Sequence, residues 1–439
     1  MGSISQEKQF KTPWVETPLV ESAPLSRAAG CRIFLKLENV QPSGSFKSRA
    51  MGSQILSHLQ KPENANRPVH FFASSGGNAG LAAVCAARSL GYPCTVVVPT
   101  STKPLMFRKL VTAGAHEVIQ HGESIWEAGE FMKNELMQKM EPSEPADIAK
   151  IALHPFDSQS IWDGNSSIVD ELVAQLPPPE SAAEKEVYGT RPAALDGIVC
   201  SVGGGGLLNG LIMGLERHGQ VNPKLRQQTS STSTSTAEKN PIRLLAIETA
   251  GTDSLATAMN SNSLVSLPKI TSQATSLGAI RVSEKTFNYA VNPPPGMTVH
   301  SSVLSDADAA RGVLRLADEE RLLVELACGV CVEAVVGDGA RARREQGRQG
   351  ERGVKRRRVT AAAAAAGKHR DEGYGDDRST TDEEGPSAGE GDEELGSKLK
   401  QLVPELKEDS RVVIVVCGGS NVTIDMAAEY HRLLDEGWE

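Results

Sequence analysis

The sequence predicts an α/β protein with two parallel-rich sheet domains. Three observations lead to this fold class. The chain has 439 residues, which is long enough for two domains with cores of their own. Short apolar segments with strand character alternate with segments of helical periodicity, and Gly-rich turns repeatedly separate a strand from the helix that follows it. This alternation is typical of βαβ units, whose strands run parallel.

The first half of the chain contains the clearest strand and helix alternation. Residues 17–20 and 24–26 are expected to be extended or turn segments, and a strand is expected at 31–38. The pattern then predicts strands at 68–74, 94–99 and 117–120 and helices at 78–90, 101–113 and 123–140. Lys47 stands at the start of a further helix-like segment.

The second half repeats the alternation and is interrupted three times. The pattern predicts strands at 197–202, 243–248 and 411–416 and helices at 158–176, 207–217 and 422–434. Residues 177–190 and 227–240 have Pro/Glu-rich and Ser/Thr-rich compositions that predict solvated loops. Residues 337–398 carry a basic block, an alanine run and an acidic Gly-rich block, a composition that predicts disorder because it buries little apolar surface.

Composition excludes several classes of function. The formal net charge of −9 does not suit a uniformly basic face for nucleic acid or anionic lipid. No apolar run reaches the roughly 18 residues of a membrane helix, and the first residues contain no hydrophobic signal core. Seven cysteines, an odd number, indicate reduced thiols. We therefore expect a cytoplasmic protein that acts on small molecules, without a nucleic-acid or membrane partner.

One lysine follows a turn in which backbone amides gather. Lys47 comes just after Pro42-Ser-Gly-Ser-Phe46 and begins an apolar segment with helical character. An amine at this place can be desolvated, as a Schiff-base lysine requires. The alternative is a solvated lysine in the first turn of a helix.

Three Gly-rich turns join a predicted strand to a predicted helix. The first is Ser74-Ser-Gly-Gly-Asn-Ala-Gly80, where a carboxylate would meet free amides and the positive end of a helix dipole. The second, Gly203-Gly-Gly-Gly206, matches neither the Walker pattern nor GxGxxG, and bare amides there would wrap a phosphate. The third contains Cys417, at the strand end where open α/β sheets bind ligands. The alternatives are an ordinary N-capped helix for the first turn and a structural thiol for Cys417.

Together these motifs resemble one enzyme family. They are Pro42–Lys47, Ser74–Gly80, His154-Pro-Phe-Asp157 with Ile161-Trp-Asp-Gly164, Ser201–Leu207, Ser266-Leu-Pro-Lys-Ile-Thr271 and Val416-Cys-Gly-Gly-Ser-Asn421. In this order they look like the L-serine/L-threonine dehydratases that depend on pyridoxal phosphate, with the single-domain eukaryotic L-serine dehydratases most similar. The resemblance implies fold type II, which is tryptophan synthase β-like, with the cofactor in a cleft. It also implies a large domain of residues 1–40 and 151–439 and a small domain of residues 41–150.

The resemblance also implies roles for single residues. Lys47 would hold the cofactor covalently and act as the catalytic base, and Phe46 would stack on the ring. Asn78 would bond the ring 3-oxygen, and Cys417 would meet the pyridine nitrogen as a neutral partner that favours β-elimination. The phosphate would lie on Gly203, Gly204, Gly205, Gly206 and Leu207. Ser75, Gly76 and Asn78 would hold the substrate carboxylate. Glu248, Thr252, Ser254, Leu277 and Ala279 look similar to a monovalent-cation site, which implies K⁺.

The implied activity is β-elimination of L-serine to pyruvate and ammonia, and of L-threonine to 2-oxobutanoate, in a homodimer that serves amino-acid catabolism and gluconeogenesis. Serine racemase or a β-replacement enzyme is the alternative, since Ser75 stands where a racemase has a second catalytic group. A cofactor-binding protein without turnover is a third hypothesis. The chain departs from the family in one motif, because it reads Glu325-Leu-Ala-Cys-Gly329 where the family usually has Glu-Pro-Ala-Cys-Gly. A rigid turn is therefore expected to be lost at Leu326.

Overall fold

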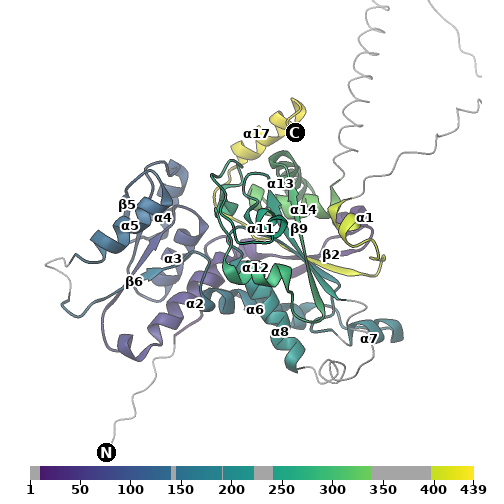
Figure 1. Cartoon of the computed structure of the whole chain (residues 1–439), viewed down its shortest axis with the longest axis horizontal. Helices are drawn as coiled ribbons and strands as arrows, with labels where there is room; N and C mark the ends of the chain where they lie inside the picture. Colours follow the sequence, from purple (N-terminus) through teal and green to yellow (C-terminus); the bar gives the residue numbers. More distant parts are fainter. Residues whose placement is uncertain (1–9, 140–144, 190, 222–240, 338–396) are drawn as a thin grey trace, which may run out of the picture. The chain divides into compact units, whose positions relative to one another are not determined.

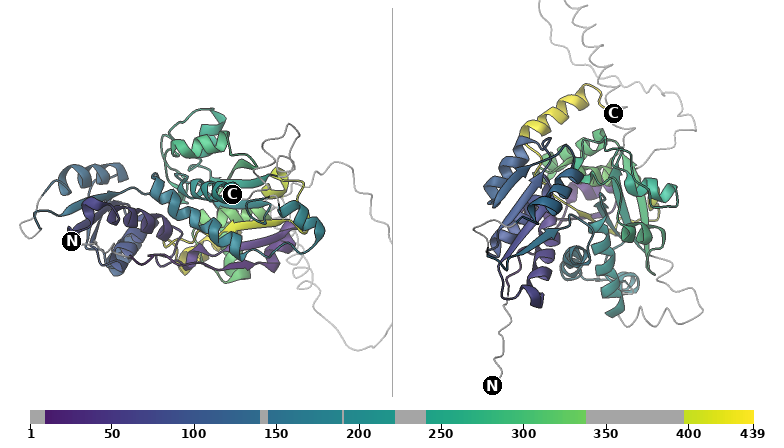
Figure 2. Two further views of the ribbon diagram at one scale, coloured as in Figure 1. Left: turned by 90° about the horizontal axis from the view of Figure 1, so that it is seen from below. Right: turned by 60° about the vertical axis from the view of Figure 1, so that its left-hand side comes forward.

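The computed structural model describes residues 10–139, 145–189, 191–221, 241–337 and 397–439. Within these residues two separate sheets are present (Figures 1 and 2). The α/β class with parallel-rich sheets is therefore confirmed. The expectations for residues 227–240 and for most of 337–398 lie outside the described residues.

The larger sheet has six strands in the order β1-β2-β10-β7-β8-β9. All neighbours pair in parallel except β1, which runs antiparallel to β2. In this spatial order the strands are Leu19–Glu21, Arg32–Lys36, Arg411–Val415, Gly197–Ser201, Ile242–Thr249 and Met297–Leu304. Strands β7, β8 and β10 are buried throughout, which explains their continuous apolar sequences.

The smaller sheet has four parallel strands in the order β5-β4-β3-β6. In this order they are Glu117–Gln120, Cys94–Val98, Val69–Ser74 and Ala149–Leu153. Both sheets belong to one compact unit that includes residues up to Gly337 and from Lys398 onward. The assignment of residues 41–150 to a small domain stays a prediction.

Helices pack on both sheets and link them (Figure 1). Helix α2 packs against both α3 and α6 and therefore lies between these two helices. In chain order the α-helices are α1 Ala23–Ala29, α2 Lys47–Leu59, α3 Asn78–Ser89, α4 Pro104–Ala113, α5 Ile125–Phe131, α6 Gln159–Gln175, α7 Ala182–Tyr188, α8 Gly206–Val221, α11 Ser254–Asn260, α12 Glu284–Val291, α13 Asp306–Glu320, α14 Leu326–Val336, α16 Lys398–Leu402 and α17 Ile424–Asp435.

Several local expectations were wrong. The segment around Pro24 forms α1, because Ser22 caps the helix and proline is tolerated in its first turn. Residues 182–188 form α7 rather than a loop, since Ser181 and Glu184 make a capping box. The helix expected at 123–140 is shorter, because α5 passes into a π-helical turn at Met132–Leu136. Strands β6 and β9 and helices α11 to α14 were not predicted.

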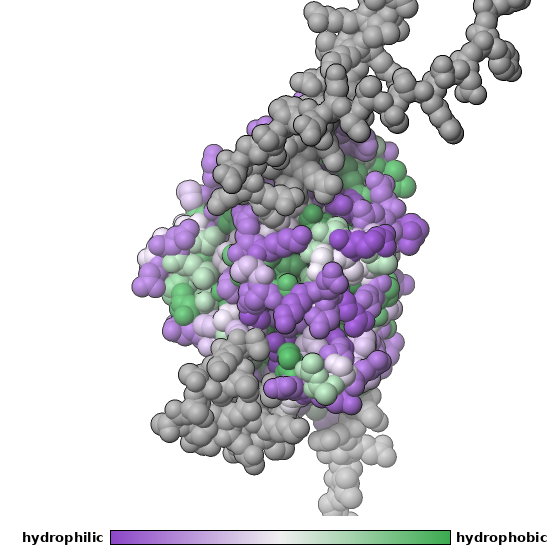
Figure 3. All heavy atoms as spheres, turned by 90° about the vertical axis from the view of Figure 1, so that its right-hand side faces the viewer, coloured by the Kyte–Doolittle hydropathy of each residue, from purple (hydrophilic) through white to green (hydrophobic). Residues whose placement is uncertain are grey.

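The face shown in Figure 3 is mainly hydrophilic, with hydrophobic side chains in separate patches. Among the described residues, no helix combines the length and the apolar character that crossing a membrane would need.

Candidate active site

A cavity of about 490 Å³ lies at the carboxyl ends of strands from both sheets. Every residue predicted to contact cofactor or substrate lines it: Phe46, Lys47, Ser75, Gly76, Asn78, Gly203, Gly204, Gly205, Gly206, Leu207 and Cys417. These residues come from four segments that are far apart in the sequence. The fold therefore brings the three Gly-rich turns and the lysine together in one place.

Lys47 is the first residue of helix α2, and its amine enters the cavity wall. Its Nζ donates a hydrogen bond to the carbonyl of Pro155 at 2.7 Å and lies 5.2 Å from the centre of the Phe46 ring. Desolvation lowers the pKa of this amine to about 8. The site thus holds an amine with a substantial neutral fraction near neutral pH, which a Schiff-base lysine needs.

Backbone contacts hold the turn before Lys47 against the end of β10. The amide of Phe46 donates to the carbonyl of Cys417 at 3.2 Å, and Ser45 pairs with Gly418 as an isolated bridge. The Cys417 side chain is buried, and its Sγ lies 3.5 Å from the Ser201 Oγ. Burial raises the pKa of the thiol to about 11, so it is uncharged at neutral pH. The cavity therefore contains a neutral polar group where the resemblance implied a neutral partner.

The tetraglycine turn cannot carry side chains. A Cβ on Gly204 would lie 2.2 Å from the Phe156 ring, and a Cβ on Gly206 would lie 2.6 Å from the Phe156 carbonyl. Gly205 has φ of +88°, and its Cβ would come within 2.0 Å of Thr286 Oγ1. The turn leads directly into α8 and leaves backbone amides at the cavity. These features suit a phosphate group.

Asn78 opens helix α3 and connects both parts of the cavity wall. Its Nδ2 donates to Glu325 Oε1 at 3.0 Å and to Ser276 Oγ at 3.4 Å, and its Oδ1 accepts from the Ser420 amide at 2.9 Å. The Glu325 carboxylate also accepts from the Asn421 amide at 2.6 Å and from the Ser276 hydroxyl. This carboxylate fixes the orientation of the Asn78 amide.

The turn before α3 is compact. Ser75 Oγ accepts weakly from the Gly77 amide at 3.4 Å. A Cβ on Gly76 would lie 2.8 Å from Thr102 Oγ1, and one on Gly80 would lie 2.0 Å from the Ser75 carbonyl. The free amides at the start of α3 face the cavity together with the Ser75 hydroxyl, an arrangement that suits a carboxylate.

The residues of the predicted cation site divide into two groups. Glu248, Thr252 and Ser254 are buried at the end of β8 and in the turn after it, whereas Leu277 and Ala279 line the cavity. The Glu248 carboxylate accepts from the amides of Leu255 and Ala256 at 2.8 Å, and burial raises its pKa to about 8. Among the described residues the buried Ser254 Oγ has no hydrogen-bond partner. This orphaned oxygen fits a cation ligand, although no cluster of three His, Cys, Asp or Glu residues occurs in the described chain.

A buried ion network supports the first turn of α2. Arg49 donates to both oxygens of Glu38, at 2.8 and 2.7 Å, and to both oxygens of Glu171, at 2.5 and 2.8 Å. Lys36 joins Glu171 at 2.5 Å. The side chains of Lys36, Glu38 and Arg49 are fully buried. Since Arg49 lies two residues after Lys47, this network fixes the helix that carries the lysine.

Several residues of the site were given no role by the sequence. Pro155 accepts the Lys47 bond, Phe156 packs on the tetraglycine turn, and Glu325 orients Asn78. In the sequence these residues were noticeable only because they belong to two short motifs, His154–Asp157 and Glu325–Gly329. Spacing alone does not reveal what such residues contact.

The fold and the cavity define a class of protein: enzymes that hold an aldehyde cofactor on a lysine and its phosphate in a glycine turn. The chain belongs to the pyridoxal-phosphate-dependent enzyme family, whose model matches residues 11–353. The lysine of lowered pKa, the tetraglycine turn, in which Gly204, Gly205 and Gly206 have no room for a Cβ atom, and the neutral thiol all fit pyridoxal phosphate.

Relatives and solved structures agree with the family. The catabolic L-serine/threonine dehydratase of Saccharomyces cerevisiae is 39% identical over 72% of this chain and 78% of the relative. The L-serine dehydratase/L-threonine deaminase of Mus musculus is 37% identical over 73% and 82%. The crystal structure of an L-serine ammonia-lyase from Rhizomucor miehei has a TM-score of 0.65 and 25% identity, covering 96% of this chain and 99% of that one. The resemblance to the L-serine dehydratases is thereby confirmed.

Maize serine racemase has a TM-score of 0.61 but only 18% identity, covering 96% of this chain and 94% of that one. This likeness supports the fold alone.

Proposed function

We propose that this protein is a pyridoxal-phosphate-dependent L-serine dehydratase that converts L-serine to pyruvate and ammonia and also acts on L-threonine. The observation that carries the proposal is the meeting of Lys47, the tetraglycine turn and Cys417 in one cavity. Its support is the identity of 37–39% to proteins named for this activity.

Different residues of the cavity bind the substrate and transfer protons in this reaction. The amides at the start of α3, with Ser75 and Gly76, bind the substrate carboxylate. When bound, pyridoxal phosphate supplies the electron sink that makes the Cα proton acidic. The neutral Nζ of Lys47 takes that proton, and its pKa of about 8 leaves about a tenth of the amine neutral at pH 7. The β-hydroxyl then leaves as water with a proton from Lys47, and hydrolysis gives the 2-oxo acid and ammonium.

Cys417 and Asn78 set the electronic environment of the reaction. The neutral Cys417 thiol would face the pyridine nitrogen of a bound cofactor and would not stabilise a positive charge there, which would favour elimination over reactions that need a fully protonated ring. Asn78, oriented by Glu325, would offer its side-chain amide to the ring 3-oxygen of the cofactor, and Phe46 would cover one face of the ring.

The decisive experiment is incubation of the purified protein, with pyridoxal phosphate supplied, with L-serine, L-threonine and D-serine. We expect 2-oxo acid from the two L-amino acids, measured by coupled NADH oxidation, and no formation of D-serine. Lys47→Ala should abolish turnover and remove the visible absorbance of the bound cofactor. A protein that stays colourless with cofactor supplied, or a variant that keeps its activity, would contradict the proposal.

A second candidate, serine racemase, rests on one observation: the Ser75 hydroxyl lines the same cavity as the Lys47 amine. Ser75→Ala separates the two functions. For a dehydratase we expect keto-acid formation to survive this change, whereas a racemase would lose D-serine formation.

Further properties are part of the proposal. Large and small domains meet at the cofactor, with residues 41–150 forming the small one, and K⁺ binds at Glu248, Thr252, Ser254, Leu277 and Ala279. The protein acts in the cytoplasm as a homodimer in amino-acid catabolism and gluconeogenesis. Support for the compartment comes from its seven free cysteines.

A further inference from the structure

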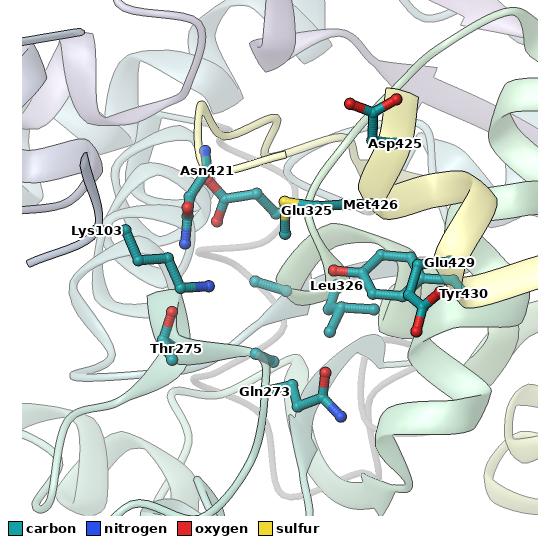
Figure 4. Close-up of a pocket in the computed structure, with 12 residues that line it drawn as sticks. Lys103, Gln273, Thr275, Glu325, Leu326, Asn421, Asp425, Met426, Glu429 and Tyr430 are labelled. Atoms are coloured by element: carbon teal, nitrogen blue, oxygen red, sulfur yellow. The ribbon is translucent and has the colours of Figure 1, made fainter. Parts of the chain in front are cut away.

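A second cavity, of about 500 Å³, adjoins the reaction cavity. Five residues line both cavities and form the boundary between them: Lys103, Thr275, Glu325, Ala327 and Asn421. Helix α17 supplies the opposite wall with Met426 and Tyr430 (Figure 4). This volume is large enough for a small metabolite, and among its lining residues only Glu325 was given a role above.

Two polar groups of the second cavity are available to a ligand. The Tyr430 residue is only 6% exposed, and its hydroxyl points into the cavity, where a ligand can reach it (Figure 4). The Oδ1 of Asn421 is buried and has no hydrogen-bond partner within the described residues. Because buried polar atoms are normally satisfied, the Asn421 oxygen indicates a missing partner, and the Tyr430 hydroxyl is available to the same ligand.

The charges that face the cavity are of both signs. The Lys103 amine points into it, whereas the Asp425 carboxylate points away (Figure 4). The Glu429 carboxylate accepts hydrogen bonds from the Arg432 guanidinium at 2.9 and 2.6 Å. The Glu325 carboxylate accepts three hydrogen bonds and therefore keeps acceptor capacity. One cation and one anion thus remain for a ligand.

We propose that this cavity binds the zwitterion of an α-amino acid, whose carboxylate meets Lys103 and Tyr430 and whose ammonium meets Glu325 and Asn421 Oδ1. The inference rests on the proposed function, since the ligand is the substrate itself, held before it passes Glu325 into the reaction cavity. The zwitterion can pair both of its charges, with Lys103 and with Glu325, whereas the anionic 2-oxo acid product has no ammonium group to pair with the Glu325 carboxylate. The cavity therefore selects substrate over product.

The test is calorimetric titration of the cofactor-loaded protein with L-alanine, which has no β-leaving group. We expect two equivalents per chain, of which only one changes the visible absorbance of the cofactor. Tyr430→Phe keeps the ring beside Trp438 and should weaken the second event about tenfold, as loss of a hydrogen bond to a charged group predicts. Lys103→Met should weaken the second event at least as much; because Lys103 also lines the reaction cavity, the absorbance change must be retained in this variant. Lys61→Met, at an exposed site away from both cavities, is the matched control.

Pyruvate gives the second arm of the experiment. We expect it to leave the second event undisturbed at concentrations where L-alanine saturates it. A single equivalent in the unaltered protein, a second event insensitive to both variants, or competition by pyruvate as strong as by L-alanine would each overturn the proposal. Failure of the proposed function looks different: the absorbance change would be missing while heat sensitive to Tyr430→Phe remained.

Discussion

Replacing Arg49 tests how the buried ion network supports the active-site helix. Arg49→Met removes the only cation in hydrogen-bond contact with Glu38 among the described residues. Glu38 would retain the Thr17 hydroxyl at 2.6 Å and the Gln41 amide at 3.2 Å, whereas Glu171 would keep Lys36. Stranding one fully buried carboxylate in this way costs about 3–5 kcal/mol of unfolding free energy.

The assay is urea unfolding, followed by circular dichroism and by cofactor absorbance, with coincident transitions as the check on two-state behaviour. The matched control is Arg432→Met. This arginine also bonds two carboxylates, Glu429 and Glu436, but on an exposed helix face. We expect no measurable change for the control.

A second change separates stranded charge from lost packing. Glu38→Gln in the Arg49→Met background removes the uncompensated charge and should recover part of the lost stability, about 1–2 kcal/mol. The reasoning fails if Arg49→Met and Arg432→Met unfold at the same urea concentration, or if Glu38→Gln lowers stability further in the double variant.

Three further predictions concern the site. The first concerns the rate at which pyridoxal phosphate attaches to the cofactor-free protein, followed by absorbance. This rate should rise with pH and level off above about pH 8, because the neutral amine of Lys47 is the nucleophile. A rate that continues to rise up to pH 10 would contradict this. Gly205→Ala should lower the free energy of unfolding, measured with urea, by about 2–4 kcal/mol because of backbone strain and the contact with Thr286. Gly296→Ala is the control, since Gly296 has a similar φ but open space around it, and should lower the same free energy by about 1 kcal/mol. Equal decreases in the two variants would refute the packing argument. Exchange of K⁺ for tetramethylammonium should lower keto-acid formation about tenfold or more, and Glu248→Gln should abolish the response to added KCl; an activity independent of the cation would reject the cation site.

The sequence predicted the parts of the fold that depend on local pattern. Continuous apolar strands such as β7 and β10 were found because they are buried on both faces. Strand β9 was missed because its residues are mostly half-buried. Helix α14 was missed because it is apolar on every side and shows no helical period.

The candidate site was predictable where backbone must approach a ligand or a neighbour. The glycines at 203–206 are visible in the sequence, and at Gly204, Gly205 and Gly206 a Cβ atom would clash with its neighbours. Glu325 was not predictable as the partner of Asn78, because the two residues are 247 positions apart and meet only in the folded chain. Lys103 and Tyr430 are similarly invisible, since a cavity between distant helices leaves no local pattern.

The replacement of the family's proline by Leu326 changes less than the sequence suggested. Leu326 is the first residue of α14, where the backbone amide has no partner within the helix in any case. The carbonyl of Glu325 accepts from the amides of Cys328 and Gly329, at 2.9 and 3.0 Å, and these bonds define the helix start without proline. Glu325 itself is extended, at φ −73° and ψ 161°, which is the conformation that a following proline would impose. The Leu326 side chain is buried in the core. Core packing therefore fixes the turn from which the Glu325 carboxylate reaches Asn78, Ser276 and Asn421. The absence of proline leaves the unfolded chain with more conformational freedom, but it does not change the conformation of the site.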